Sequence, residues 1–144
     1  MTNPNNNPLR VLWRGFTKRC PRCGAGHLFN GWFDLKPYCP RCSYKFEREE
    51  GFFLGAYVIN LGISELGVVA VVVALIVREA QGRAGSLVPW LLAAAALQLV
   101  LPLLFYPLSK SIWAAFDLIM RPLEPYEEAE ALLRKEGPDQ SPDA

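Results

Sequence analysis

Two long stretches of this chain carry almost no charge, and they limit its possible folds more than any other feature. Region 52–77 has Glu65 as its single charged residue, and region 86–109 has none. A helix needs about 20 apolar residues to cross a bilayer core of about 30 Å. The sequence therefore predicts two transmembrane helices, at 53–77 and 86–108. The alternative is a pair of buried helices in a soluble domain, but so small a chain has little other apolar surface to cover them.

Lysine and arginine are distributed unequally around the two stretches. Nine precede the first stretch, four follow the second, and the connecting loop contains only Arg78 and Arg83. Cytoplasmic loops of membrane proteins carry an excess of these residues. We therefore expect both termini in the cytoplasm and a short loop on the other side of the membrane.

All four cysteines lie ahead of the first stretch, in two Cys-Pro-Arg-Cys tetrads. The first tetrad contains Cys20 and Cys23, the second contains Cys39 and Cys42, and fifteen residues separate them. Two such pairs match the tetrahedral ligand set of Zn²⁺ in a zinc ribbon. Iron also binds four thiolates, so the spacing does not choose between the metals. A reducing cytoplasm favours such metal thiolates over structural disulfides.

A metal bound by four protein thiolates has no open coordination position, so the predicted site stabilises a fold and performs no catalysis. The alternative is thiol–disulfide exchange, in which Arg22 and Arg41 would favour the thiolate. That alternative lacks the βαβ context of thioredoxin-like proteins. No nucleophile paired with a base is apparent either. We therefore do not expect an enzyme.

Composition and periodicity divide the rest of the chain into shorter segments. We expect a disordered leader at 1–7, a basic amphipathic helix at 8–19, the zinc-ribbon module at 20–46, a helix continuation or interfacial helix at 109–121, a short acidic helix at 122–136 and a disordered tail at 137–144. Within the ribbon, Asn30-Gly31 predicts a hairpin turn, and Tyr44–Phe46 is a candidate third strand. Pro102 and Pro107 predict a kink in the second long helix.

The helix expected at 8–19 has an apolar face with basic residues around it. Leu9, Leu12, Trp13 and Phe16 recur at helical spacing. Such a helix suits the headgroup region of an anionic membrane. The alternative is a helix that packs on the metal module.

Four polar residues of the two long stretches are candidates for contacts inside the membrane. Glu65 is near the middle of the first, together with Asn60 and Ser64, and Gln98 has a similar depth in the second. A charge at that depth costs at least ~2.5 kcal/mol. We expect a Glu65–Gln98 hydrogen bond between the helices or a contact with a partner subunit. The alternative is an ion or proton pathway, which two helices form only in an oligomer.

The run Cys-Pro-Arg-Cys-Gly-Ala-Gly-His-Leu-Phe-Asn-Gly-Trp-Phe at 20–33, the second tetrad and the two apolar stretches carry a family resemblance. Over roughly residues 10–120 the chain resembles a bacterial family of small membrane proteins, domain of unknown function 983. The resemblance implies this architecture in the bacterial inner membrane, and it implies no activity.

Together these features predict a membrane α-helical protein, with a small cytoplasmic zinc-ribbon module ahead of two transmembrane helices. The function that fits best is a non-catalytic adaptor, accessory subunit or assembly factor of an inner-membrane complex. The ribbon would present Phe29, Trp32 and Phe33 to a membrane protein partner or a second copy. The main alternative is metal handling or transport through Glu65, followed by thiol redox chemistry. Nucleic-acid binding is not expected, because topology and anionic lipid already explain the basic charge.

Overall fold

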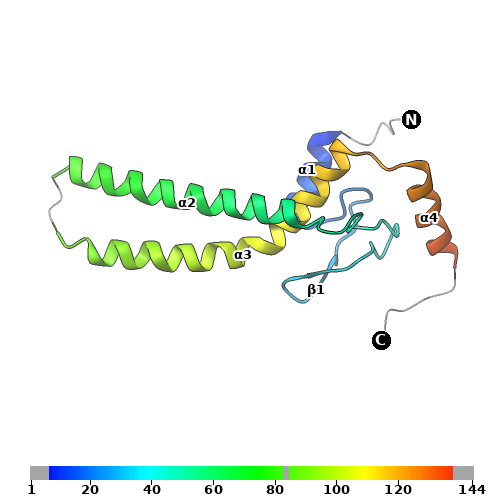
Figure 1. Cartoon of the computed structure of the whole chain (residues 1–144), viewed down its shortest axis with the longest axis horizontal. Coiled ribbons are helices and arrows are strands. Elements are labelled where there is room, and N and C mark those ends of the chain that lie inside the picture. The colour runs from blue at the N-terminus through cyan, green and yellow to red at the C-terminus, as the bar shows by residue number, and fades with distance from the viewer. Residues whose placement is uncertain (1–6, 83–84, 138–144) are drawn as a thin grey trace.

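The computed structural model describes residues 7–82 and 85–137. Its elements are α1 (Pro8–Phe16), β1 (Phe29–Asn30), β2 (Asp34–Leu35), α2 (Leu54–Ala80), α3 (Val88–Met120) and α4 (Pro125–Glu136). In Figure 1, α2 and α3 run side by side as a long antiparallel hairpin, and all other elements gather at one end of it. The expected disordered leader and tail lie, except for their innermost residues, outside the described residues.

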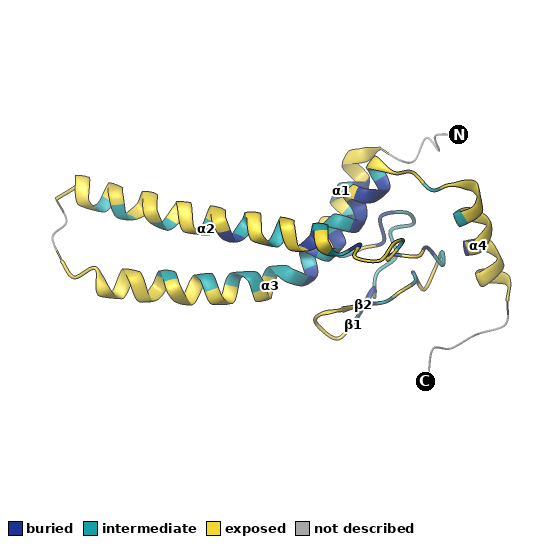
Figure 2. Ribbon diagram, viewed as in Figure 1, coloured by how far each residue is buried: buried dark blue, intermediate teal, exposed yellow. Residues whose placement is uncertain are grey.

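Both α2 and α3 are long and apolar enough to cross a membrane. Of the most apolar 18-residue window, 6% is buried in α2 and 0% in α3. Figure 2 shows the exposed residues along both helices. The core helix of a soluble protein would be mostly buried, so the exposure of α2 and α3 differs from that expected for two buried helices in a soluble domain.

The helix α3 continues through the segment expected to be either a continuation or an interfacial helix. It runs without interruption from Val88 to Met120, with Pro102 and Pro107 inside it. Figure 1 shows its ribbon changing direction in the yellow part before it reaches α1. A proline has no N–H for the carbonyl four residues earlier and its ring clashes there, which explains the bend.

The helix α1 is shorter than predicted and packs through a different face. It ends at Phe16 rather than at residue 19, because Lys18 takes a left-handed backbone conformation with φ 54°. Val11 and Gly15 are buried, whereas the predicted apolar face, which includes Trp13, is largely exposed. The helix therefore packs on α3 through small residues and leaves its large apolar side chains uncovered.

Gly15 permits the close approach of α1 to α3. A Cβ at this position would lie 2.6 Å from Cβ of Ala115 and 2.9 Å from the backbone oxygen of Ser111. We expect Gly15→Ala to push the helices apart and weaken their packing by about 1–3 kcal/mol, as overpacking does. Hydrogen exchange of the α1 amides would measure the loss. Gly62→Ala is the control, because nothing lies within 4 Å of that Cβ; equal exchange in both variants would contradict the prediction.

The ribbon is a small hairpin over a few buried side chains. Strands β1 and β2 pair antiparallel, with Phe29 opposite Leu35. The expected third strand is only an isolated bridge between Tyr38 and Lys45. The largest buried side chains of the ribbon are Leu28, Tyr44 and Phe46. So small a core is typical of modules that need a metal to fold.

Candidate metal centre

The two tetrads form the same local loop. Gly24 N donates to Cys20 O at 2.8 Å, and Ser43 N donates to Cys39 O at 2.9 Å. Gly24 and Ser43, each directly after the second cysteine of its tetrad, have φ of 78° and 52°. The left-handed conformation suits glycine and is less favourable for serine. Each loop turns its two cysteine side chains toward the other pair.

The four sulfur atoms form a compact cluster. Cys20 Sγ lies 3.8 Å from Cys42 Sγ, and Cys23 Sγ lies 3.6 Å from Cys39 Sγ. All four atoms lie within 4.8 Å of one another. A tetrahedron with Zn–S bonds of about 2.3 Å has sulfur–sulfur edges of about 3.8 Å. The residues therefore fit a tetrahedral thiolate-bound metal ion, and the same set fits iron.

The four thiols compete for protons. Hydrogen bonds with Cys39 and Cys42 raise the pKa of the Cys20 thiol. The hydrogen bond from Cys20 lowers the pKa of the Cys39 thiol. The sulfur atoms share protons because neighbouring negative charges repel one another. A divalent cation removes this conflict and lets all four bind as thiolates.

One comparison with known proteins places this chain in a family. A family model described as protein of unknown function (DUF983) matches residues 29–117, more than half of the chain. The chain belongs to the DUF983 family. No curated protein and no solved structure matches it. The family resemblance is therefore confirmed. The matched region of this DUF983 protein includes Cys39 and Cys42 and begins after Cys20 and Cys23.

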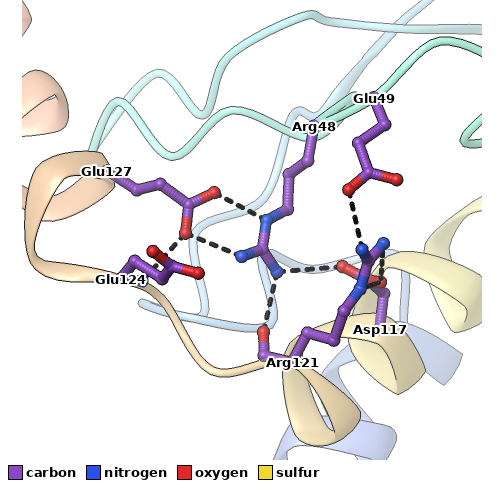
Figure 3. Close-up of polar contacts among 6 residues, drawn as sticks. All are labelled: Arg48, Glu49, Asp117, Arg121, Glu124 and Glu127. Atoms are coloured by element: carbon purple, nitrogen blue, oxygen red, sulfur yellow. Dashed lines mark hydrogen bonds and ion pairs between the residues drawn. The ribbon is translucent and has the colours of Figure 1, made fainter.

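A partly buried arginine joins the ribbon to α3 and α4. Arg48 Nε and Nη2 donate to the two carboxylate oxygens of Glu127, at 2.7 and 2.6 Å. Its Nη1 donates to Asp117 at 3.1 Å and to the backbone oxygen of Arg121 at 2.7 Å. Figure 3 shows the guanidinium between these groups, with Glu49 paired to Arg121 beside it. We call Arg48, Asp117 and Glu127 the Arg48 network.

This network was not predicted from the sequence. Arg48 was counted only among the nine basic residues ahead of the first long stretch. One available signal was that Asp117 is the sole acidic residue of α3, within an otherwise apolar turn of the helix. Its side chain is 4% exposed. A carboxylate so deeply buried needs partners, and Arg48 and Arg121 supply them at 3.1 and 3.0 Å.

The helix α4 covers the face of the ribbon that carries both tetrads. Arg22, inside the first tetrad, pairs with Glu128 at 3.4 Å. The guanidinium of Arg134 lies 3.8 Å from the ring centre of Tyr38, next to the second tetrad. Ala131 is buried between these contacts. The acidic helix is therefore attached to the basic ribbon by charge as well as by packing.

The attachment of α4 should weaken in acid. Burial pushes the pKa of Glu127 upward, but the hydrogen bonds from Arg48 outweigh it and hold the pKa below its usual range. A pKa lowered on folding stabilises above the unfolded value of about 4.3, and the stabilisation is lost as pH falls through the folded value. We expect hydrogen exchange in α4 to accelerate below about pH 4.3.

The Glu127→Gln variant separates this effect from acid release of the metal. At neutral pH the amides of α4 should exchange faster in this variant than in the wild type. As the pH falls, the variant should show no further acceleration from residue 127, because glutamine has no carboxyl group to protonate. Metal content must be followed in the same samples. An identical pH profile in the wild type and the variant would contradict the prediction.

The polar residues in the long helices do not pair as predicted. Asn60 Nδ2 donates to Pro102 O at 3.1 Å, and Ser64 Oγ donates to Asn60 O at 2.9 Å. Gln98 lies on the side of α2 that carries Gly67. Among residues 7–82 and 85–137, Glu65 forms no hydrogen bond or ion pair, and it is exposed. The predicted Glu65–Gln98 bond is therefore wrong.

Helix geometry explains the error. Successive residues turn about 100° around a helix axis. Asn60, Ser64 and Gly67 consequently share the face of α2 that contacts α3, and Glu65 turns away from it. Glu65 and Gln98 have a similar depth along their helices, but the angle around the helix axis decides which side chains meet.

The aromatic side chains at the turn of the hairpin lie beside α3. Trp32 Nε1 contacts Leu103 O at 3.5 Å, and the ring of Phe33 lies 6.0 Å from that of Tyr106. Both residues therefore contact α3 and are also exposed, so their contact with a partner stays a prediction.

Proposed function

We propose that this DUF983 protein is a non-catalytic adaptor, accessory subunit or assembly factor of a bacterial inner-membrane complex. In this proposal α2 and α3 span the membrane, the ribbon binds Zn²⁺, and both termini are cytoplasmic. The Lys and Arg excess on the ribbon side supports that orientation. Figure 1 agrees with the topology, since α1 and α4 lie at the same end of the hairpin.

The chemistry of the ribbon supports a structural role. Four thiolates complete a tetrahedral set, so a bound Zn²⁺ would have no position for a substrate or water. The Arg48 network attaches the ribbon to α3 and α4 through three carboxylate contacts. A module fixed in this way is suited to holding a surface in one orientation.

The observation that carries the proposal is the position of Glu65. Its side chain is exposed on an otherwise apolar face of α2, beside the exposed Leu61 and Leu66. A charged carboxylate facing lipid at this depth costs at least ~2.5 kcal/mol. A polar group of another subunit would remove that cost by hydrogen bonding. We therefore propose that this face of α2 contacts a membrane protein partner or a second copy of the chain.

Affinity purification from membranes in mild detergent tests this function. We expect a stoichiometric partner with the wild type and a roughly tenfold loss with Glu65→Leu, since about 1.4 kcal/mol changes an equilibrium tenfold. Glu79→Leu is the matched control, because Glu79 is exposed at the far end of the same helix. Differently tagged copies reveal whether the partner is the chain itself. Equal recovery with both variants would refute the contact.

The second candidate function is metal handling or transport through Glu65. The exposed carboxyl halfway along α2 favours it, because carboxylates inside membranes often serve ion pathways. Metal flux into vesicles that contain the purified protein distinguishes the two. Transport requires flux that Glu65→Gln abolishes, whereas the adaptor function predicts no flux in either protein.

A further inference from the structure

The turn of the β1–β2 hairpin lies against α3, at the end of the α2–α3 hairpin that adjoins the ribbon. Trp32 Nε1 contacts Leu103 O at 3.5 Å, and Lys110 Nζ donates to Phe33 O at 3.0 Å. The segment is therefore attached at two successive residues, and both contacts use the backbone of one partner and a side chain of the other.

The contact with α3 uses a carbonyl that the helix itself leaves free. In a regular helix Leu103 O would accept from the N–H four residues later. That residue is Pro107, which has no N–H. The indole N–H of Trp32 takes the place of the missing backbone N–H, so the hairpin turn supplies the hydrogen-bond donor that Pro107 lacks.

The turn lies at the depth where the uncharged part of α3 ends. No charged residue occurs from Val88 to Ser109, and Lys110 is the first. At 1.5 Å per residue, Leu103 lies about 10 Å from Lys110 along the helix axis, inside the uncharged part of α3. Tyr57 and Tyr106, whose hydroxyls are 3.0 Å apart, lie at the same level. Tryptophan and tyrosine concentrate at the boundary between lipid and water.

Two lysines lie over these aromatic rings. Lys18 Nζ is 4.7 Å from the ring centre of Trp32, and Lys110 Nζ is 4.8 Å from that of Tyr106. Within the described parts of the chain, neither lysine forms an ion pair with a carboxylate. Trp32 is 51% exposed and Phe33 is 46% exposed. We call these five residues the hairpin-tip surface.

We infer that the hairpin-tip surface enters the headgroup layer and that Lys18 and Lys110 bind the phosphate of an anionic phospholipid. The inference rests on the proposal that α2 and α3 span the bilayer. Two features select lipid as the occupant. The surface is continuous with the exposed apolar side of α3 at Leu103 and Leu104. Its ammonium groups, which have no carboxylate partner in the described parts of the chain, complement a negative headgroup. The metal ribbon is then anchored directly to the membrane.

Quenching of tryptophan fluorescence by brominated lipid tests the insertion. The metal-loaded full chain is placed in vesicles of phosphatidylcholine and phosphatidylglycerol, with bromine near the headgroup end of the acyl chains. Subtracting the spectra of Trp32→Phe and Trp90→Phe from that of the wild type isolates each residue. We expect both to be quenched by bromine, and Trp32 to be protected from aqueous iodide.

Lipid retention tests the two lysines. The protein is purified from the same vesicles, and bound phosphatidylglycerol is counted by native mass spectrometry. Because each lysine near an anionic surface changes affinity about fivefold, Lys18→Gln with Lys110→Gln should weaken retention about thirtyfold. Lys45→Gln with Lys135→Gln is the control, since it removes the same charge from exposed positions beside or on α4. We expect that control to retain lipid as the wild type does.

The outcomes separate this inference from the proposed function. Quenching of Trp90 without quenching of Trp32 overturns the insertion and leaves the spanning helices intact. If neither Trp32 nor Trp90 is quenched, the proposal that α2 and α3 span the bilayer is overturned, and the inference with it. Equal lipid retention in the two double variants overturns the phosphate site, whatever the quenching shows.

Discussion

Replacing Cys39 with serine is expected to unfold the ribbon and to leave the α2–α3 hairpin helical. The wild type should bind one thiophilic metal ion per chain, and the variant should bind none stably. Structural Zn²⁺ contributes about 10–16 kcal/mol of apparent free energy to modules of this kind. Whole domains are stable by only about 5–15 kcal/mol. Loss of one ligand therefore removes more free energy than the few buried side chains of the ribbon supply.

Elemental analysis and hydrogen exchange measure the two parts of this result. Metal content should fall to zero, and the amides of residues 20–46 should lose protection while those of α2 keep it. Chelation followed by addition of Zn²⁺ is the control, because it changes no covalent bond and should reverse the loss. A protected ribbon without metal in reducing buffer would contradict the prediction. Tetrads that cycle between dithiol and disulfide in cells would instead support the redox alternative.

Replacing Arg48 with methionine is expected to detach α4 and loosen the ribbon from α3. The change leaves the carboxylate of Asp117, which is 4% exposed, with the half-exposed Arg121 as its remaining ion-pair partner. Removing one member of a buried ion pair typically costs about 3–5 kcal/mol. The loss should appear as a lower midpoint for the ribbon in denaturant unfolding and as fast exchange in α4.

Two further variants test the cause of that loss. Adding Asp117→Leu to Arg48→Met should recover much of the stability, because an apolar replacement of a buried pair is often neutral. Glu128→Gln should cost at most about 1 kcal/mol, since its pair with Arg22 is largely solvated. A loss for Arg48→Met no larger than that control would refute a structural role for the network.

The elements that the sequence predicted well depend on short-range patterns. The spacing of Cys20, Cys23, Cys39 and Cys42 was enough to predict one compact ligand set, which the sulfur atoms form. Charge-free runs were enough to predict two long apolar helices. The end of α1 was predicted less well: its apolar pattern and the helix both end at Phe16, and the left-handed Lys18 lies within the predicted range 8–19.

The polar contacts of the helices were predicted poorly for a different reason. Depth along a helix can be counted in residues, but the facing direction depends on how two helices turn toward each other. Glu65 and Gln98 have similar depth and different directions. Glycine weakens a helix, but Gly15 allows the close approach of α1 to α3, which the sequence did not reveal.

The sequence by itself determined the parts of this protein: a four-thiolate ligand set and two helices long and apolar enough to span a membrane. These follow from residues near one another in the chain, where spacing dictates geometry. Only the tertiary structure decided how the parts are joined. Arg48 meets Asp117 and Glu127 across 69 and 79 residues, and Trp32 meets Leu103 across 71. Charge and hydrogen-bonding capacity indicate that such groups need partners, but the fold selects which partner lies within reach.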